Sequence, residues 1–141
     1  MLVAVLDTNV LIAAVLAPVG APGQLVAAAF RLEFSLVLSE LLLAELGDVL
    51  TRPRIAARVA PHQASAYIEA IEGVAVLVED PVDRPAATRD PDDDFIVALA
   101  IATSVDCIVS GDQDLPQAQA MAMSIRVMTP SAFLAELRHT P

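Results

Sequence analysis

The sequence predicts an α/β sandwich built around a parallel β-sheet. Five short apolar segments have the length and composition of buried strands, and helical segments alternate with them along the 141 residues. Pro and Gly residues interrupt the chain between these segments. No apolar run reaches the roughly 18–20 residues that a membrane-spanning helix needs. We therefore expect one soluble domain over residues 1–141, large enough for its own core.

The order of the elements follows from apolar runs and from capping and breaking residues. The predicted strands cover residues 2–6, 34–38, 74–78, 107–109 and 125–128. The predicted helices cover residues 10–16, a segment ending near 31, 39–51, 54–60, 61–73, 92–104 and a C-terminal segment opened by Thr129 and Pro130. Thr8 or Asn9 is the expected cap of the first helix, and Ser39 of the third.

The charge composition restricts the function. The net charge is −10, and all eight basic residues are arginine. A chain without an overall basic surface is not expected to bind nucleic acid by simple electrostatic attraction. Metal ions, however, can reverse the local sign of an acidic pocket and bring in a phosphate.

The cysteine content and the N-terminus indicate a cytoplasmic protein. Cys107 is the only cysteine, so no intrachain disulfide can form, and its expected role is that of a small buried apolar residue. The N-terminus lacks a basic segment, and Asp7 interrupts its apolar run, which is not typical of a signal peptide.

Acidic residues recur where the predicted strands and helices meet. Asp7 and Asp112 follow predicted strands, and ligands of parallel sheets bind at the carboxyl ends of the strands. Glu45 would share the apolar stripe of its helix, where a carboxylate is costly unless it is paired or bound to a metal. Glu40, in the first helical turn, has a simpler structural explanation, because it favours the positive helix end.

The segment RDPDDDFIVALA places four aspartates before an apolar helix. Asp90 or Asp92 can cap this helix, and helical phase alone leaves Asp92, Asp93 and Asp94 as candidates for the site. Asp112 and Asp114 in SGDQDL could share one cation, although the same spacing is found in ordinary Asx turns.

Taken together, the acidic segments predict a site for a divalent cation. Four segments bring carboxylates toward one edge of the sheet, and such like charges are unfavourable unless they are protonated or bridged. Oxygen ligands favour Mg²⁺ or Mn²⁺ over zinc. His62 and His139 lie in no motif and are expected at the surface, which argues against a histidine-pair nuclease mechanism.

These motifs resemble those of the PIN domain family, in particular its VapC-like toxin ribonucleases. The resemblance runs from about residue 2 to 137 and is carried by VLDTNVLIAA, SELLLAELGDVLTRP, DPDDDFIVALAIA and IVSGDQDL, in this order. It implies that the metal ligands and catalytic carboxylates are Asp7, Glu45, Asp93 and Asp112. Asp114 would be an accessory metal ligand, and Asn9 and Ser110 would support the site. Ser110 stands where threonine is frequent in the family, and Asp94 where asparagine is common.

The resemblance also implies a fold, a reaction and partners. The fold would be a three-layer α/β/α sandwich around a central parallel sheet. The activity would be hydrolysis of RNA phosphodiester bonds with one or two Mg²⁺ or Mn²⁺ ions, which activate water and stabilise negative charge. A small antitoxin with a basic segment would block the acidic site, and homodimers are common. Arg52, Arg54 and Arg58 could contact RNA, although a solvated helix face is the favoured interpretation.

Three alternatives can be weighed against this hypothesis. Haloacid-dehalogenase-like phosphatases also begin with a strand ending in Asp, but they need a second Asp two residues later and a lysine. This chain has Asn9 at that position and no lysine, and the missing lysine also excludes a response-regulator receiver. A catalytically degenerate PIN-like binding or dimerisation module is the third alternative, and the intact acidic set argues against it.

Overall fold

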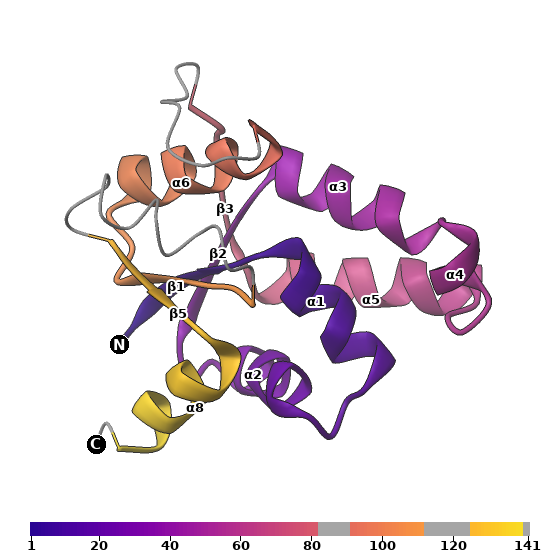
Figure 1. The fold of residues 1–141 in the computed structure, drawn as a ribbon, viewed down its shortest axis with the longest axis horizontal. Coiled ribbons are helices and arrows are strands. Elements are labelled where there is room, and N and C mark those ends of the chain that lie inside the picture. Colours follow the sequence, from indigo (N-terminus) through magenta and orange to yellow (C-terminus); the bar gives the residue numbers. More distant parts are fainter. Residues whose placement is uncertain (82–90, 112–124, 140–141) are drawn as a thin grey trace.

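Five parallel strands form one sheet at the centre of the molecule (Figure 1). The computed structural model describes residues 1–81, 91–111 and 125–139, with the side chains of 91–94 excepted. The strands are β1 (Val3–Leu6), β2 (Ser35–Ser39), β3 (Val76–Val78), β4 (Cys107–Val109) and β5 (Arg126–Met128). Their order across the sheet is β3-β2-β1-β4-β5, and every neighbouring pair is parallel. The predicted parallel α/β sheet is confirmed.

Helices cover both faces of the sheet (Figure 1). The described helices are α1 (Thr8–Leu16), α2 (Ala21–Phe30), α3 (Glu40–Leu50), α4 (Pro53–Ala56), α5 (Pro61–Val74), α6 (Pro91–Thr103) and α8 (Pro130–His139). Helix α6 packs on β1 and β4 from one side, whereas α2 and α8 lie together on the other side. The three-layer α/β/α arrangement is therefore also confirmed.

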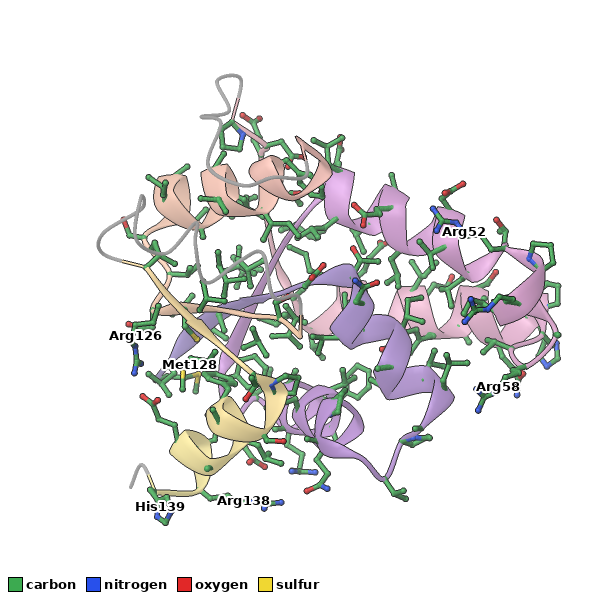
Figure 2. All side chains as sticks on the ribbon, viewed as in Figure 1. Arg52, Arg58, Arg126, Met128, Arg138 and His139 are labelled. Atoms are coloured by element: carbon green, nitrogen blue, oxygen red, sulfur yellow. The ribbon has the colours of Figure 1, made fainter. Side chains whose placement is uncertain are left out.

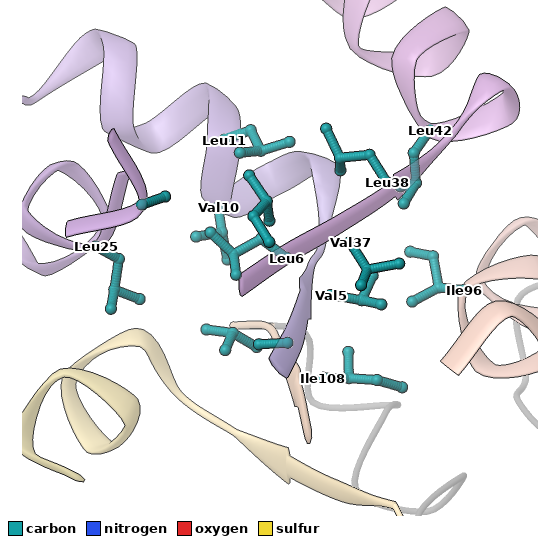
Figure 3. Close-up of a cluster of buried hydrophobic side chains, with 14 of the residues drawn as sticks. Val5, Leu6, Val10, Leu11, Leu25, Val37, Leu38, Leu42, Ile96 and Ile108 are labelled. Carbon is teal, nitrogen blue, oxygen red and sulfur yellow. The ribbon is translucent and has the colours of Figure 1, made fainter. Parts of the chain in front are cut away.

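Alternate strand residues supply the two halves of the core (Figure 3). Val5, Val37 and Ile108 lie on the side of the sheet that faces Ile96 of α6, whereas Leu6 lies on the side of α1 and α2. Successive side chains of a strand point to opposite faces, so strands covered on both faces must be apolar throughout. This explains why the central strands are continuous apolar runs rather than alternating ones.

Local sequence signals set several helix ends correctly. The Ser39 hydroxyl accepts a hydrogen bond from the Leu42 backbone N–H at 3.3 Å and caps α3 as predicted. The Thr129 hydroxyl accepts one from the Ala132 N–H at 3.1 Å and caps α8. Helix α4 is shorter than the predicted 54–60, because the chain leaves helical geometry before Pro61 begins α5.

The predicted cap of α1 is wrong, and one of the two caps considered for α6 is excluded. Helix α1 begins at Thr8, so Asp7 occupies the cap position in place of Thr8 or Asn9. Helix α6 begins at Pro91, which places Asp92 inside the helix, whereas the alternative cap, Asp90, lies outside the described residues.

No single described helix is long and apolar enough to cross a membrane, and α1 and α2 meet that criterion only as a pair bent by 99°.

Candidate active site

The carboxyl end of β1 places Asp7 at the point where the chain order of the sheet reverses. β1 lies between β2 and β4. The next two strands in sequence, β2 and β3, extend to one side of β1, and the last two, β4 and β5, extend to the other. Parallel α/β proteins commonly bind their ligands at such a reversal point, outside the carboxyl ends of the strands. Asp7 follows β1 directly, and Ser110 follows β4.

Hydrogen bonds fix Asp7 and Ser110 against each other. The Ser110 Oγ donates to Asp7 Oδ2 at 2.8 Å, across 103 positions of the chain. The Asp7 backbone N–H donates to the Val109 carbonyl at 3.0 Å, and the Ser110 N–H donates to the Met128 carbonyl at 2.9 Å. The ends of β1, β4 and β5 thus form one rigid unit around the Asp7 carboxylate.

The Asp7 side chain does not cap its helix. Asp7 occupies the cap position of α1, yet its carboxylate makes no capping hydrogen bond. Its backbone carbonyl accepts the first helical bonds instead, from the N–H groups of Val10 and Leu11. Only 2% of Asp7 is exposed, and burial of a carboxylate is costly unless a partner compensates for it. Helix capping, the simple structural explanation of Asp7, is therefore excluded.

Two neighbours of Asp7 on α1 have different environments. Thr8 is buried, and its Oγ1 has no hydrogen-bond partner among the described residues. Asn9 is exposed and lines a pocket between α1, α3 and α4, and its role in supporting Asp7 stays a prediction. No sequence pattern marks the buried Thr8 hydroxyl, because a threonine after a strand is equally typical of a helix cap.

Glu45 and Glu40 occupy different faces of α3. The buried face of this helix consists of Leu42, Leu46 and Leu50, with Glu45 half-buried beside it and Glu40 exposed in the first turn. Helix α3 packs against α1, the helix that begins next to Asp7. Glu45 is thus the more buried of the two, as its expected place on the apolar stripe requires, although Leu41, one turn before it, is 44% exposed. Its role in the site stays a prediction.

The remaining predicted ligands lie outside the described side chains. Asp93 belongs to the first turn of α6, whose side chains are described only from Phe95 onward. Asp112 and Asp114 fall in 112–124, outside the described residues, and Gly111 is the last described residue after β4. The described residues alone do not bring three Asp, Glu, His or Cys side chains together.

The described donors fit a hard divalent cation. Asp7 carries carboxylate oxygens that such a cation prefers, and the Ser110 hydroxyl orients one of them; Glu45, on α3, is a further carboxylate whose place in the site stays a prediction. The soft and nitrogen ligands that zinc prefers are elsewhere: Cys107 is buried in β4, and His62 and His139 are exposed on α5 and α8. The predicted surface positions of both histidines are confirmed.

This architecture defines an α/β protein with an acidic site at the carboxyl edge of a parallel sheet. The chain belongs to the PIN domain family, whose model matches residues 3–114. No curated protein matches it significantly. The structure is similar to that of VapBC2 from Rickettsia felis, solved with a DNA fragment from their promoter, with a TM-score of 0.62 and 11% identity. That match covers 91% of this chain and 98% of the other.

A second solved structure gives the same fold. PAE2754 from Pyrobaculum aerophilum has a TM-score of 0.62 at 17% identity, covering 99% of this chain and 91% of the other. At these identities the two structures establish the fold. The family model, which spans most of the chain, establishes the membership in a family that consists generally of nucleases.

Proposed function

We propose that this protein is a Mg²⁺- or Mn²⁺-dependent endoribonuclease. The observation that carries the proposal is the buried Asp7 carboxylate at the switch point of the sheet, which caps no helix and is held by Ser110. A chain with a net charge of −10 can accept a phosphodiester there only if a cation offsets the carboxylates. RNA is the proposed substrate because of the resemblance of the four acidic motifs.

The proposed chemistry divides roles among the acidic residues. Asp7, Glu45, Asp93 and Asp112, with Asp114 as an accessory, would hold one or two divalent cations. When bound, such cations polarise the phosphoryl oxygens and lower the pKa of an attacking water. Ser110 fixes the orientation of the Asp7 carboxylate, which lets the protein keep the ligand oxygen in place before substrate arrives. Burial of the strand ends limits bulk water on the core side of the site.

The protein is further proposed to be the toxin of a toxin–antitoxin pair in the cytoplasm. Two observations support an antitoxin partner. One of the similar structures is VapBC2, and the strongly acidic chain suits a partner with a basic or arginine-bearing segment. A homodimer is part of the same hypothesis, and it stays a prediction.

Cleavage of a mixed RNA pool tests the proposal. Single-stranded and structured RNAs are incubated with wild type and with Asp93→Asn, in Mg²⁺, in Mn²⁺ and in chelator. We expect cleavage only by the wild type with metal. The positions of the cuts would then indicate which RNA sequence or structure the protein prefers. A folded, metal-loaded wild type that leaves the whole pool intact would favour the alternative, a degenerate binding or dimerisation module.

A further inference from the structure

A pocket of about 570 Å³ opens between α1, α3 and α4. It adjoins the candidate active site through Asn9, which stands two residues after Asp7 on the first turn of α1. Pockets of this size hold small organic ligands. The residues that line it are Asn9, Ile12, Val49, Arg52, Pro53, Arg54 and Ile55.

The lining combines an apolar wall with a polar rim. Ile12, Val49 and Ile55 supply aliphatic surface, Asn9 supplies an amide that can both donate and accept, and the two arginines are exposed. A nucleotide has the matching groups: a flat base with polar edges and an anionic phosphate. The lining has no aromatic side chain, so stacking on a base would fall to a guanidinium plane, which proteins use for unpaired RNA bases.

The charge around this pocket differs from that of the chain as a whole. Three of the eight arginines, Arg52, Arg54 and Arg58, lie within seven residues of a chain with a net charge of −10. Figure 2 shows Arg52 and Arg58 at the α4 end of the molecule, on the opposite side from Arg126 and Arg138. The α4 end is therefore a local cationic region.

Arg54 is the arginine best placed to contact a ligand. Arg52 forms an exposed ion pair with Asp48 at 3.3 Å, and Arg58 donates to the Leu16 carbonyl at 3.2 Å. Among the described residues, Arg54 has no ion-pair partner and is exposed at the pocket rim. Its charge is therefore available to a phosphate without breaking an ion pair to another residue of the described segments.

We propose that this pocket is a subsite for single-stranded RNA, holding a nucleotide next to the scissile phosphate. An unstacked base would pack against Ile12 and Ile55 with its edge toward Asn9, and Arg54 would bind the adjoining backbone phosphate. The subsite rests on the proposed ribonuclease function, because it takes its position from the reacting bond at Asp7. It also supplies cationic contacts that the acidic site itself lacks.

Charge favours RNA over a protein segment as the occupant. A basic segment that suits the acidic site would meet repulsion from Arg52 and Arg54 at this rim, whereas a polyanion is attracted there and is brought to the cation site by the same strand. The pocket would thus set the polarity of the strand, with one flanking nucleotide fixed before cleavage.

The test separates the phosphate contact from the base contact. Binding of fluorescein-labelled 12-nucleotide oligouridylate and oligoadenylate is measured in Ca²⁺ at several salt concentrations, with RNA integrity checked on gels. Each phosphate contact to a single strand contributes about 0.7 to the slope of log affinity against log salt. Arg54→Ala should therefore lower this slope by about 0.7. Arg138→Ala removes an equal charge from an exposed site on α8 and should leave the slope unchanged.

Ile55→Ala tests the base contact. Each methylene group buried against the base contributes about 0.8 kcal/mol, so this variant should bind at least about fourfold more weakly at an unchanged salt slope. Because Ile55 is half-buried, a melting curve must confirm that the variant is folded. Photocrosslinking of oligomers that contain 4-thiouridine should label the segments 9–12 and 49–55, which line the pocket.

Three results would overturn the subsite. The first is wild type that binds neither oligomer, and the second is a salt slope for Arg54→Ala equal to that for Arg138→Ala. The third is a set of crosslinks that fall only outside residues 9–12 and 49–55. If RNA is cleaved in an Asp93-dependent manner and Arg54→Ala binds and cleaves like wild type, the subsite fails and the ribonuclease function stands. If Arg54-dependent binding occurs without any cleavage, the ribonuclease function fails and the pocket keeps its RNA contact.

Discussion

At the scale of single residues, the pair formed by Asp7 and Ser110 gives the clearest indication of a functional rather than a purely structural role. The two side chains come from strands that are neighbours in the sheet and far apart in sequence, and both are buried. A carboxylate used only for local structure would have capped α1, which this one does not. The protein thus maintains a buried carboxylate in a fixed orientation at the edge where ligands bind.

Ser110→Ala tests this orienting role. The variant removes the hydroxyl that donates to Asp7 Oδ2, and the loss of a group that orients a metal ligand typically reduces activity about 10- to 100-fold. Metal-dependent RNA cleavage measures the effect. Ser110→Thr keeps a hydroxyl and should retain most of the activity, which a purely steric role of Ser110 would not explain. Equal rates for Ser110→Ala and wild type would exclude the orienting role.

Cys107 gives a residue-scale prediction about pH. Burial raises the pKa of the Cys107 thiol from 9.0 to about 12, while nearby Arg126 lowers it in part. Above about pH 9 the unfolded chain loses this proton and the folded chain keeps it. The free energy of unfolding should therefore fall as the pH rises from 9 toward 12, by about 1.36 kcal/mol per pH unit for one proton.

Cys107→Ala removes this contribution. The free energy of unfolding, measured with urea, should therefore fall less steeply between pH 9 and 12 in the variant than in the wild type. Burial also raises the pKa of Tyr67, whose hydroxyl donates to the Leu11 carbonyl at 2.7 Å, and the variant leaves that contribution in place. An unchanged slope in the variant would show that the thiol does not titrate differently in the two states.

At the scale of elements, one close approach fixes α2 against the preceding turn. A Cβ at Gly23 would lie 2.1 Å from the Pro18 carbonyl oxygen, whereas a Cβ at Gly73, on α5, would meet nothing within 4 Å. Gly23→Ala should therefore destabilise the protein by at least about 1–3 kcal/mol through overpacking against backbone. Gly73→Ala should stabilise it by roughly 0.5–1 kcal/mol, because alanine is the better helix former. Chemical unfolding measures the change in the free energy of unfolding for each variant, and the two changes should have opposite signs. Equal changes would contradict the structure.

Elements were predictable where their signals are local. Apolar runs located all five strands, and Ser39 and Thr129 located two caps, because a cap depends on residues three positions apart. The use of the Asp7 side chain was not predictable from its neighbours. Its partner Ser110 is 103 residues away, and only the pairing of β1 with β4 brings the two together.

The pocket beside Asn9 was missed for the same reason. Its wall combines Ile12 of α1 and Val49 of α3 with the short helix α4. The packing of these helices creates the pocket, and no pattern within a single segment of the sequence predicts that packing. The only local signal was the cluster Arg52–Pro53–Arg54, whose favoured interpretation was a solvated face. For Glu45 and Glu40, helical phase predicted the difference in burial, with Glu45 half-buried and Glu40 exposed, whereas the role of Glu45 as a metal ligand stays a prediction.

At the scale of the whole molecule, folding and metal binding should be linked. The proposed ligands come from segments far apart in the chain, so the proposed cation site would exist only in the folded state, and a cation bound there would stabilise that state. At a free concentration 100-fold above its dissociation constant, the gain would be about 2.7 kcal/mol. We expect a higher melting temperature in Mg²⁺ or Mn²⁺ than in chelator, measured by calorimetry at constant ionic strength. Equal melting temperatures would count against a metal site.

The acidic charge of the molecule also has a consequence at this scale. Because the chain has a net charge of −10, it repels RNA at long range, so the proposed substrate would have to be attracted locally. The proposed cations at Asp7 and the arginines near α4 would supply this attraction and would let an acidic chain act on a polyanion.

The most direct measurement of this account is the rate of metal-dependent RNA cleavage by Asp7→Asn. Asparagine keeps the size of the side chain and an oxygen that can accept from Ser110, and it removes the charge that a cation requires. Glu40→Gln makes the same change of charge at an exposed position on α3 and serves as the control. The account predicts a loss of at least about 100-fold for Asp7→Asn and wild-type rates for Glu40→Gln, with both variants folded. Wild-type cleavage by Asp7→Asn would contradict it.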